Sequence, residues 1–98
     1  MPSEMATPPL PDLILYSRPG CHLCDETRAV LQSLLEDRAA SGRPIAHLHE
    51  RNIDDDLTAH QAYSDKIPVI ELKGRRIELA TSPARLRQFL ADGLDTLA

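Results

Sequence analysis

The stretch YSRPGCHLC, residues 16–24, decides the fold of this 98-residue chain. It holds the only two cysteines, Cys21 and Cys24, in a C-x-x-C spacing. An apolar run at residues 13–16 precedes the two cysteines, and apolar residues at helical spacing run on from the C-x-x-C. The first thiol would face the free N–H groups and partial positive charge of a helix start, which favour a thiolate. A strand, a C-x-x-C and a helix in this order predict a thiol-disulfide site.

The composition and length indicate a small single-domain protein and exclude several classes of partner. A mass of 10.9 kDa fits one domain, and a net charge of -4 offers no basic field to attract nucleic acid. Residues 1–9 lack the charged and apolar regions of a signal peptide, and no apolar run reaches membrane-spanning length. We expect a flexible N-terminal tail at residues 1–11, a domain at residues 12–98, no membrane association, and a cytoplasmic monomer.

The expected compartment changes the meaning of the cysteines. Cytosolic thiols are kept reduced, so a permanent structural bridge between near neighbours would be neither stable nor useful there. Two roles for the cysteine pair therefore remain: a dithiol that cycles between its reduced and oxidised forms, or a pair of metal ligands.

Apolar spacing and turn residues predict four strands and three helices. The strands are expected at residues 12–16, 45–53, 66–72 and 75–79, and the helices at residues 22–38, at residues 57–63 and from Pro83 onward. The near alternation of residues 45–53 is typical of an edge strand with one solvated face. Lys73-Gly74 predicts the turn of a hairpin, and Ser82 before Pro83 predicts a helix start.

This order, β-α-β-α-β-β-α with C-x-x-C at the first strand-to-helix turn, resembles the thioredoxin fold in its minimal, glutaredoxin-like form. The resemblance runs from Asp12 to about Ala91. It is carried by residues 16–24, by Lys66-Ile67-Pro68-Val69 and by Arg51-Asn52-Ile53-Asp54. It implies an α/β fold, a three-layer α/β/α sandwich with a four-stranded mixed sheet.

The resemblance also implies a function, that of a thiol-disulfide oxidoreductase in cell redox homeostasis. Cys21 would be the nucleophile and Cys24 the resolving thiol, working through a mixed disulfide. The implied substrate is a disulfide-containing protein or a glutathione mixed disulfide. Glutathione or a thioredoxin-type reductase system would be the reductant, and no tightly bound cofactor is expected.

Five further residues gain roles from the same resemblance. Pro68 matches a proline that is cis in this family and faces the dithiol, which leaves the backbone of Ile67 to pair with a substrate strand. Arg18 stands where glutaredoxins often carry a cation, which would favour the thiolate and attract a glutathione carboxylate. His22 and Leu23 replace the usual Pro-Tyr between the cysteines, where residues tune the reduction potential.

The segment before the last helix departs from the family pattern. Glutaredoxins bind the γ-glutamyl end of glutathione there with a glycine pair followed by an acid, whereas this chain has Ala80-Thr81-Ser82-Pro83. Thr81 and Ser82 can cap the helix and offer hydroxyls, but Pro83 removes an N–H donor. The sequence therefore predicts a divergent glutaredoxin-like branch with weak glutathione binding.

Two other functions stay open. Cys21 and Cys24 are half of a tetrahedral zinc or iron-sulfur site, and His47 and His49 share one face of a predicted strand. That strand is expected to lie away from the first helix start, and the spacing fits no common zinc pattern, so we assign no metal ligand. An iron-sulfur cluster shared between two chains, as in the wider family, and a non-catalytic thioredoxin-fold binding module remain as alternatives.

Overall fold

The computed structural model describes residues 10–95 of the chain. Its elements are, in order, β1 (Asp12–Ser17), α1 (His22–Ala40), β2 (His47–Asn52), the 3-10 helix η2 (Ile53–Asp55), α2 (Leu57–Tyr63), β3 (Val69–Leu72), β4 (Arg75–Ile77) and α3 (Pro83–Leu94). Residues 1–9 of the expected tail and residues 96–98 of the expected domain lie outside the described part. Among the described helices, none combines the length and the apolar character needed to cross a membrane.

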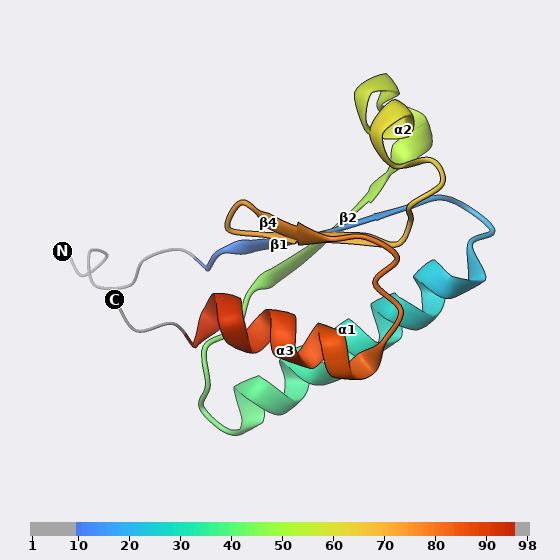
Figure 1. The fold of residues 1–98 in the computed structure, drawn as a ribbon. Coiled ribbons are helices and arrows are strands. Elements are labelled where there is room, and N and C mark those ends of the chain that lie inside the picture. The colour runs from blue at the N-terminus through green and yellow to red at the C-terminus, as the bar shows by residue number, and fades with distance from the viewer. Residues whose placement is uncertain (1–9, 96–98) are drawn as a thin grey trace, which may run out of the picture.

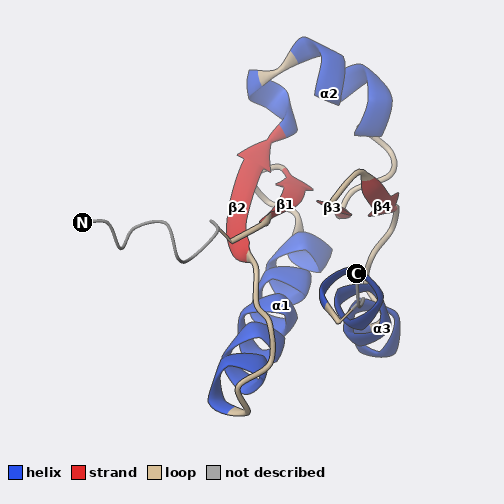
Figure 2. Ribbon diagram, turned by 90° about the vertical axis from the view of Figure 1, so that its left-hand side faces the viewer, coloured by secondary structure: helices blue, strands red, loops and turns tan. Residues whose placement is uncertain are grey.

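The four strands form one mixed sheet in the order β2-β1-β3-β4 (Figure 1). β1 runs parallel to β2 and antiparallel to β3, and β3 runs antiparallel to β4. Figure 2 shows α1 and α3 on one face of the sheet and α2 on the other. The predicted α/β fold with three layers and a mixed sheet is confirmed, and β2 is an edge strand as expected.

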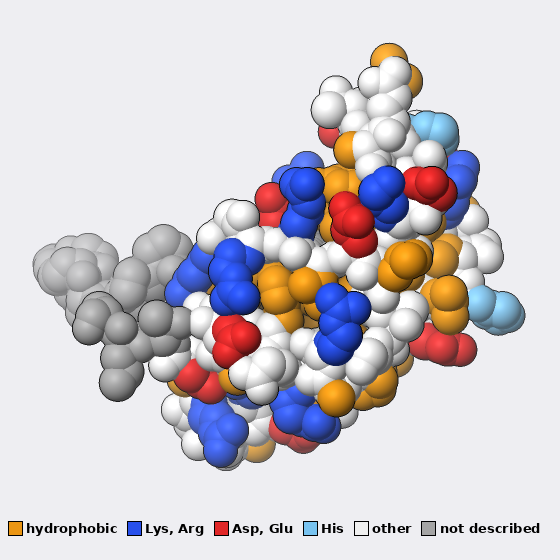
Figure 3. Space-filling view, viewed as in Figure 1, with side chains coloured by type: hydrophobic (Ala, Val, Ile, Leu, Met, Phe, Trp, Pro, Cys, Tyr) orange, Lys and Arg blue, Asp and Glu red, His pale blue; other side chains and the backbone are white. Residues whose placement is uncertain are grey.

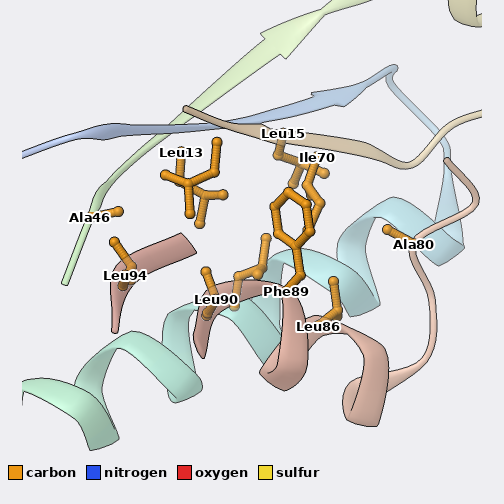
Figure 4. Close-up of a cluster of buried hydrophobic side chains, with 11 residues drawn as sticks. Leu13, Leu15, Ala46, Ile70, Ala80, Leu86, Phe89, Leu90 and Leu94 are labelled. Carbon is orange, nitrogen blue, oxygen red and sulfur yellow. The ribbon is translucent and has the colours of Figure 1, made fainter. Parts of the chain in front are cut away.

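The hydrophobic core lies between the sheet and the helices α1 and α3 (Figure 4). Leu13 and Leu15 of β1 point into it, while Ile14 and Tyr16 alternate onto the opposite face. On that opposite face, the ring of Tyr16 packs against Tyr63 of α2 with the centroids 4.8 Å apart. The core residues are Leu13, Leu15, Leu31, Ala46, Ile70, Leu72, Ala80, Leu86, Phe89, Leu90 and Leu94.

β3 and β4 are shorter than the sequence predicts because their flanking residues cannot extend a ladder. β3 begins at Val69 rather than at residue 66, since Pro68 has no N–H and Lys66 belongs to the turn after α2, where its N–H donates to the carbonyl of Tyr63. β4 ends at Ile77, two residues early, because Leu79 has a φ of 50° and is not extended.

The second strand and the first helix also differ from their predicted bounds. β2 covers His47–Asn52 instead of residues 45–53, because the side chain of Asn52 accepts the N–H of Asp54 and starts η2. α1 extends two residues beyond the expected end, to Ala40. α2 has its predicted bounds, since the carboxylate of Asp56 accepts the N–H groups of its first turn.

Charges of both signs cover the face of the molecule seen in Figure 3. Lys and Arg side chains lie among Asp and Glu side chains, with apolar side chains between them. On the described part of this face, no field of a single sign dominates.

Candidate functional site

A four-residue turn joins β1 to α1 and carries the first cysteine. β1 ends at the buried Ser17, and α1 begins at His22. Gly20 has a φ of 82°, a left-handed conformation that residues with a Cβ rarely adopt. The N–H of Cys21 donates to the carbonyl of Arg18 at 3.3 Å and closes the turn. The chain therefore enters the helix directly at Cys21.

The two cysteines form a disulfide at the start of α1, with their Cα atoms 5.2 Å apart. Cys21 is the N-cap residue, and its Sγ accepts the backbone N–H of Cys24 at 3.1 Å. Cys24 is fully buried, whereas Cys21 is partly exposed. A reactant arriving from solvent can reach Cys21 but not Cys24.

The sheet register brings the other segments of interest to the same edge. Tyr16 of β1 pairs with Val69 of β3, so the residues before β3 lie beside the turn that follows β1. Ile70 pairs with Ile77 of β4, so the loop after β4 reaches the same edge. The cysteine turn, the loop before β3 and the loop before α3 therefore meet at one end of the sheet.

The Ile67–Pro68 peptide bond is cis, the isomer that the resemblance implies, and Pro68 is buried. The N–H of Leu79 donates to the carbonyl of Lys66 at 2.9 Å, and the N–H of Ala80 donates to that of Pro68 at 2.8 Å. These bonds fix the loop on both sides of Ile67. Within residues 10–95, the N–H and C=O of Ile67 itself make no hydrogen bond.

The loop before α3 is tied to α1 by a buried hydrogen bond. The hydroxyl of Thr27 donates to the carbonyl of Ala80 at 2.7 Å. Ser82 is the N-cap of α3, where its Oγ accepts the N–H of Arg85 at 3.3 Å, so this hydroxyl serves the helix. Thr81 is exposed beside it.

The remaining predicted site residues surround the first turn of α1. His22 and Leu23 are both exposed, and Leu23 presents an apolar side chain to solvent next to the disulfide. Arg18 points its guanidinium at Asp54, which follows β2, with an N–O distance of 3.0 Å. The positive charge expected to serve the thiolate is thus held in an ion pair, a contact that sequence reasoning missed.

A second polar cluster beside the turn was also missed. Arg28 of α1 makes two hydrogen bonds to the carboxylate of Glu50 on β2, at 2.7 and 2.6 Å, and a 3.1 Å ion pair with Asp25. The hydroxyl of Ser17, the last residue of β1, donates to Glu50 at 2.6 Å. The i,i+3 spacing of Asp25 and Arg28 predicts the ion pair between them from sequence alone. The contact between Arg28 and Glu50 could not be predicted in this way, because it depends on the register of β2 in the sheet.

The contact between Arg28 and Glu50 shifts the pKa values of both side chains. The hydrogen bond from Arg28 is the largest cause that lowers the pKa of Glu50, and the Ser17 hydroxyl acts in the same direction against the partial burial of the carboxylate. The same contact raises the pKa of Arg28. A groove of about 430 Å³ lies here, lined among others by Arg18, Gly20 and Glu50. The groove offers charged groups of both signs directly beside the cysteine turn.

His47 and His49 do not join the cysteines. The parallel register pairs His47 with Asp12 at the start of β1, whereas Ser17, next to the cysteine turn, pairs with Asn52. The two imidazole rings do share one face of β2, as predicted, with centroids 4.3 Å apart. A zinc site made from both cysteines and both histidines is excluded by the length of β1.

The comparisons with known proteins agree with the fold. The family model described as Glutaredoxin-like domain (DUF836) matches residues 12–92. No curated protein matches the chain.

Solved structures of two bacterial proteins are similar to this chain. The X-ray structure of Northeast Structural Genomics target protein XcR50 from X. campestris is 32% identical over 82% of this chain and 96% of that chain, with a TM-score of 0.65. The solution structure of XcR50 gives a TM-score of 0.62, again with 32% identity, over 82% and 92% of the two chains. The solution structure of protein Ne2328 from Nitrosomonas europaea is 30% identical over 74% and 79%, with a TM-score of 0.56.

The lowered pKa of Glu50 predicts a pH-dependent contribution to stability. A carboxyl whose pKa is lower in the folded than in the unfolded state stabilises the fold above the unfolded pKa, and this stability is lost as pH falls through the folded pKa. Glu50→Gln should therefore reduce the free energy of unfolding above about pH 5, and the difference from wild type should shrink below about pH 4. Urea unfolding at a series of pH values measures this difference.

Glu36→Gln is the matched control. Glu36 is an exposed carboxylate of α1 that makes no ion pair within residues 10–95. Its substitution should change the free energy of unfolding only slightly at every pH. If the Glu50 and Glu36 variants gave the same pH profile, the cluster around Arg28 would have no role in stability.

Proposed function

The chain belongs to the glutaredoxin-like domain family, and on that premise we propose that it is a thiol-disulfide oxidoreductase that works through Cys21 and Cys24. The observation that carries the proposal is the difference in exposure within the disulfide: Cys21 is partly exposed and caps α1, whereas Cys24, one helical turn later, is fully buried. An exposed thiol can attack a disulfide in another molecule. A buried thiol can attack only the sulfur next to it.

The start of α1 supports the thiolate form of Cys21. Its sulfur accepts the backbone N–H of Cys24 in the first turn, where the helix leaves N–H groups free and carries partial positive charge. Both effects stabilise a negative sulfur. Asp25 opposes them, and its ion pair with Arg28 offsets part of its charge.

The proposed cycle follows thiolate exchange. The Cys21 thiolate attacks one sulfur of a substrate disulfide, the substrate S–S bond breaks, and the leaving sulfur takes a proton. Cys24 then loses its proton and attacks the Cys21 sulfur, which forms the Cys21–Cys24 bond and releases the second substrate thiol. Two electrons have passed from the pair to the substrate. A thiol reductant of the cytoplasm, glutathione or a thioredoxin-type reductase system, returns them.

The loop around the cis proline offers a place for an extended substrate segment. The backbone N–H and C=O of Ile67 have no hydrogen-bond partner in the described part of the chain, and they lie between two hydrogen bonds that hold the loop in place. Such groups pair readily with a strand of another chain. The exposed side chains of Leu23 and Leu79 add apolar contact at the same end of the sheet. These features favour a protein disulfide as substrate.

Glutathione has fewer partners here than in a typical glutaredoxin. The Ser82 hydroxyl already caps α3, and Pro83 at the first helical position has no N–H to offer. Arg18 is engaged by Asp54. Thr81 remains as an exposed hydroxyl. We infer that this site binds glutathione with low affinity.

The dithiol mechanism predicts different outcomes for the two cysteine variants. With a protein disulfide as substrate, Cys21→Ser should abolish reduction, whereas Cys24→Ser should accumulate a covalent mixed disulfide at Cys21 because the resolving thiol is gone. Mass spectrometry of the unreduced protein detects the adduct. Ser33→Ala, a substitution on the exposed face of α1, is the control and should behave as wild type.

Equilibration with graded ratios of reduced and oxidised glutathione completes this test. The wild-type chain should convert between the dithiol and the intramolecular disulfide as the ratio changes. After treatment with an alkylating reagent, the mass of the disulfide form should lack the two alkyl groups that the dithiol form carries on Cys21 and Cys24. A pair that never forms this bond, or an adduct that forms equally on Cys24 in the Cys21→Ser variant, would contradict the mechanism.

A second prediction concerns substrate preference. Because the segment before α3 has few groups for the γ-glutamyl end, reduction of a small glutathionylated disulfide should be slow compared with reduction of a protein disulfide. Parallel assays of the two substrates measure the ratio. A fast rate on the small glutathionylated substrate would refute the inferred weakness of the glutathione site.

A further inference from the structure

A second group of chemically active side chains lies at the opposite end of β1 from the cysteines. His47 and His49 are two residues apart on β2, so both project from the same face of this edge strand. The parallel register pairs His47 with Asp12, the first residue of β1. Two adjacent strands therefore direct two imidazoles and one carboxylate to a single point on the surface.

The side chains are already close to one another. The Nε2 of His49 lies 2.9 Å from Oδ1 of Asp12, and the rings of His47 and His49 have centroids 4.3 Å apart. One donor atom from each residue can be chosen so that all three lie within 4.8 Å of one another. The side chains of His49 and Asp12 are 41% and 64% exposed, so solutes reach the group freely.

This donor set matches the chemistry of borderline divalent metals. Imidazole nitrogens and a carboxylate oxygen are common ligands of Zn²⁺, at about 2.0–2.2 Å, which puts neighbouring donors of a tetrahedral site about 3.3 Å apart. The His49–Asp12 distance of 2.9 Å is near that spacing. The distances from the His47 donor atom to the other two can shorten by rotation of these exposed side chains. Mg²⁺ and Ca²⁺ prefer sites built from oxygen atoms, so they fit poorly.

We propose that Asp12, His47 and His49 form a binding site for a divalent transition-metal ion of the Zn²⁺ type. The site is independent of the thiol-disulfide chemistry, because the length of β1 separates it from Cys21. Three protein ligands leave at least one coordination position for water or a fourth donor.

The surroundings leave the site accessible. It lies on the sheet face opposite α1 and α3, and α2 packs over the other end of that face, near Tyr16 (Figure 2). Charged neighbours on the same face are Arg51, two positions after His49 on β2, and Glu71 of β3, which pairs with Ile14. Arg51 lies toward Tyr16, where both line one groove.

The test is a titration of the full chain, in its disulfide form, with ZnCl₂ alone. The disulfide form is essential because it removes both thiolates as competing ligands. Isothermal titration calorimetry should find one ion per chain. The double variant His47→Gln/His49→Gln should lose at least about tenfold in affinity, and Asp12→Asn should weaken binding to a smaller degree.

His60→Gln is the matched control. His60 lies 3.8 Å from Asp54, so it forms a histidine–aspartate pair that lacks a second imidazole, and its loss should leave zinc affinity unchanged. Binding to the folded state should also raise the thermal unfolding midpoint of wild type and of the control, but not of the double variant. No saturable binding, or equal affinity in wild type and the double variant, would overturn the proposal.

Discussion

The hydrogen bond from the Cys24 N–H to the Cys21 sulfur is the contact on which the account depends. A helix must find partners for the N–H groups of its first turn, and α1 takes one of them from a cysteine rather than from the usual Ser, Thr, Asp or Asn. The sulfur that closes the helix is thereby also the sulfur that faces solvent. In the proposed dithiol form, the N–H group that this sulfur caps would also stabilise its thiolate.

The mixed sheet explains why the other site segments meet this sulfur. β1 and β3 are antiparallel central strands, so the end of one lies beside the start of the other, and the loop containing Pro68 is adjacent to the cysteine turn. The hydroxyl of Thr27 then joins α1 to the carbonyl of Ala80, and Arg28 joins α1 to Glu50 on β2. Side chains of α1 thus attach the helix that follows the cysteine turn to the loop before α3 and to the edge strand β2.

The sequence predicted the features that depend on local chemistry. The bounds of α2 follow from the Asp56 cap, and the start of α1 follows from the Gly20 turn and Cys21. It could not predict contacts that require strand register. The Arg28–Glu50 pair spans two elements, and Asp12 meets His47 only because β1 and β2 pair in that alignment. The left-handed backbone of Leu79, which shortens β4, has no signal in its side chain.

The central claim is that the start of α1 separates the two thiols into one that attacks and one that resolves. The most direct measurement reduces the pair, removes the reductant, and follows alkylation by iodoacetamide at each cysteine with fragment-resolved mass spectrometry. Cys21 should react first, and the fully buried Cys24 should lag by at least about tenfold. Equal rates at the two cysteines, or faster reaction of Cys24, would contradict the central claim.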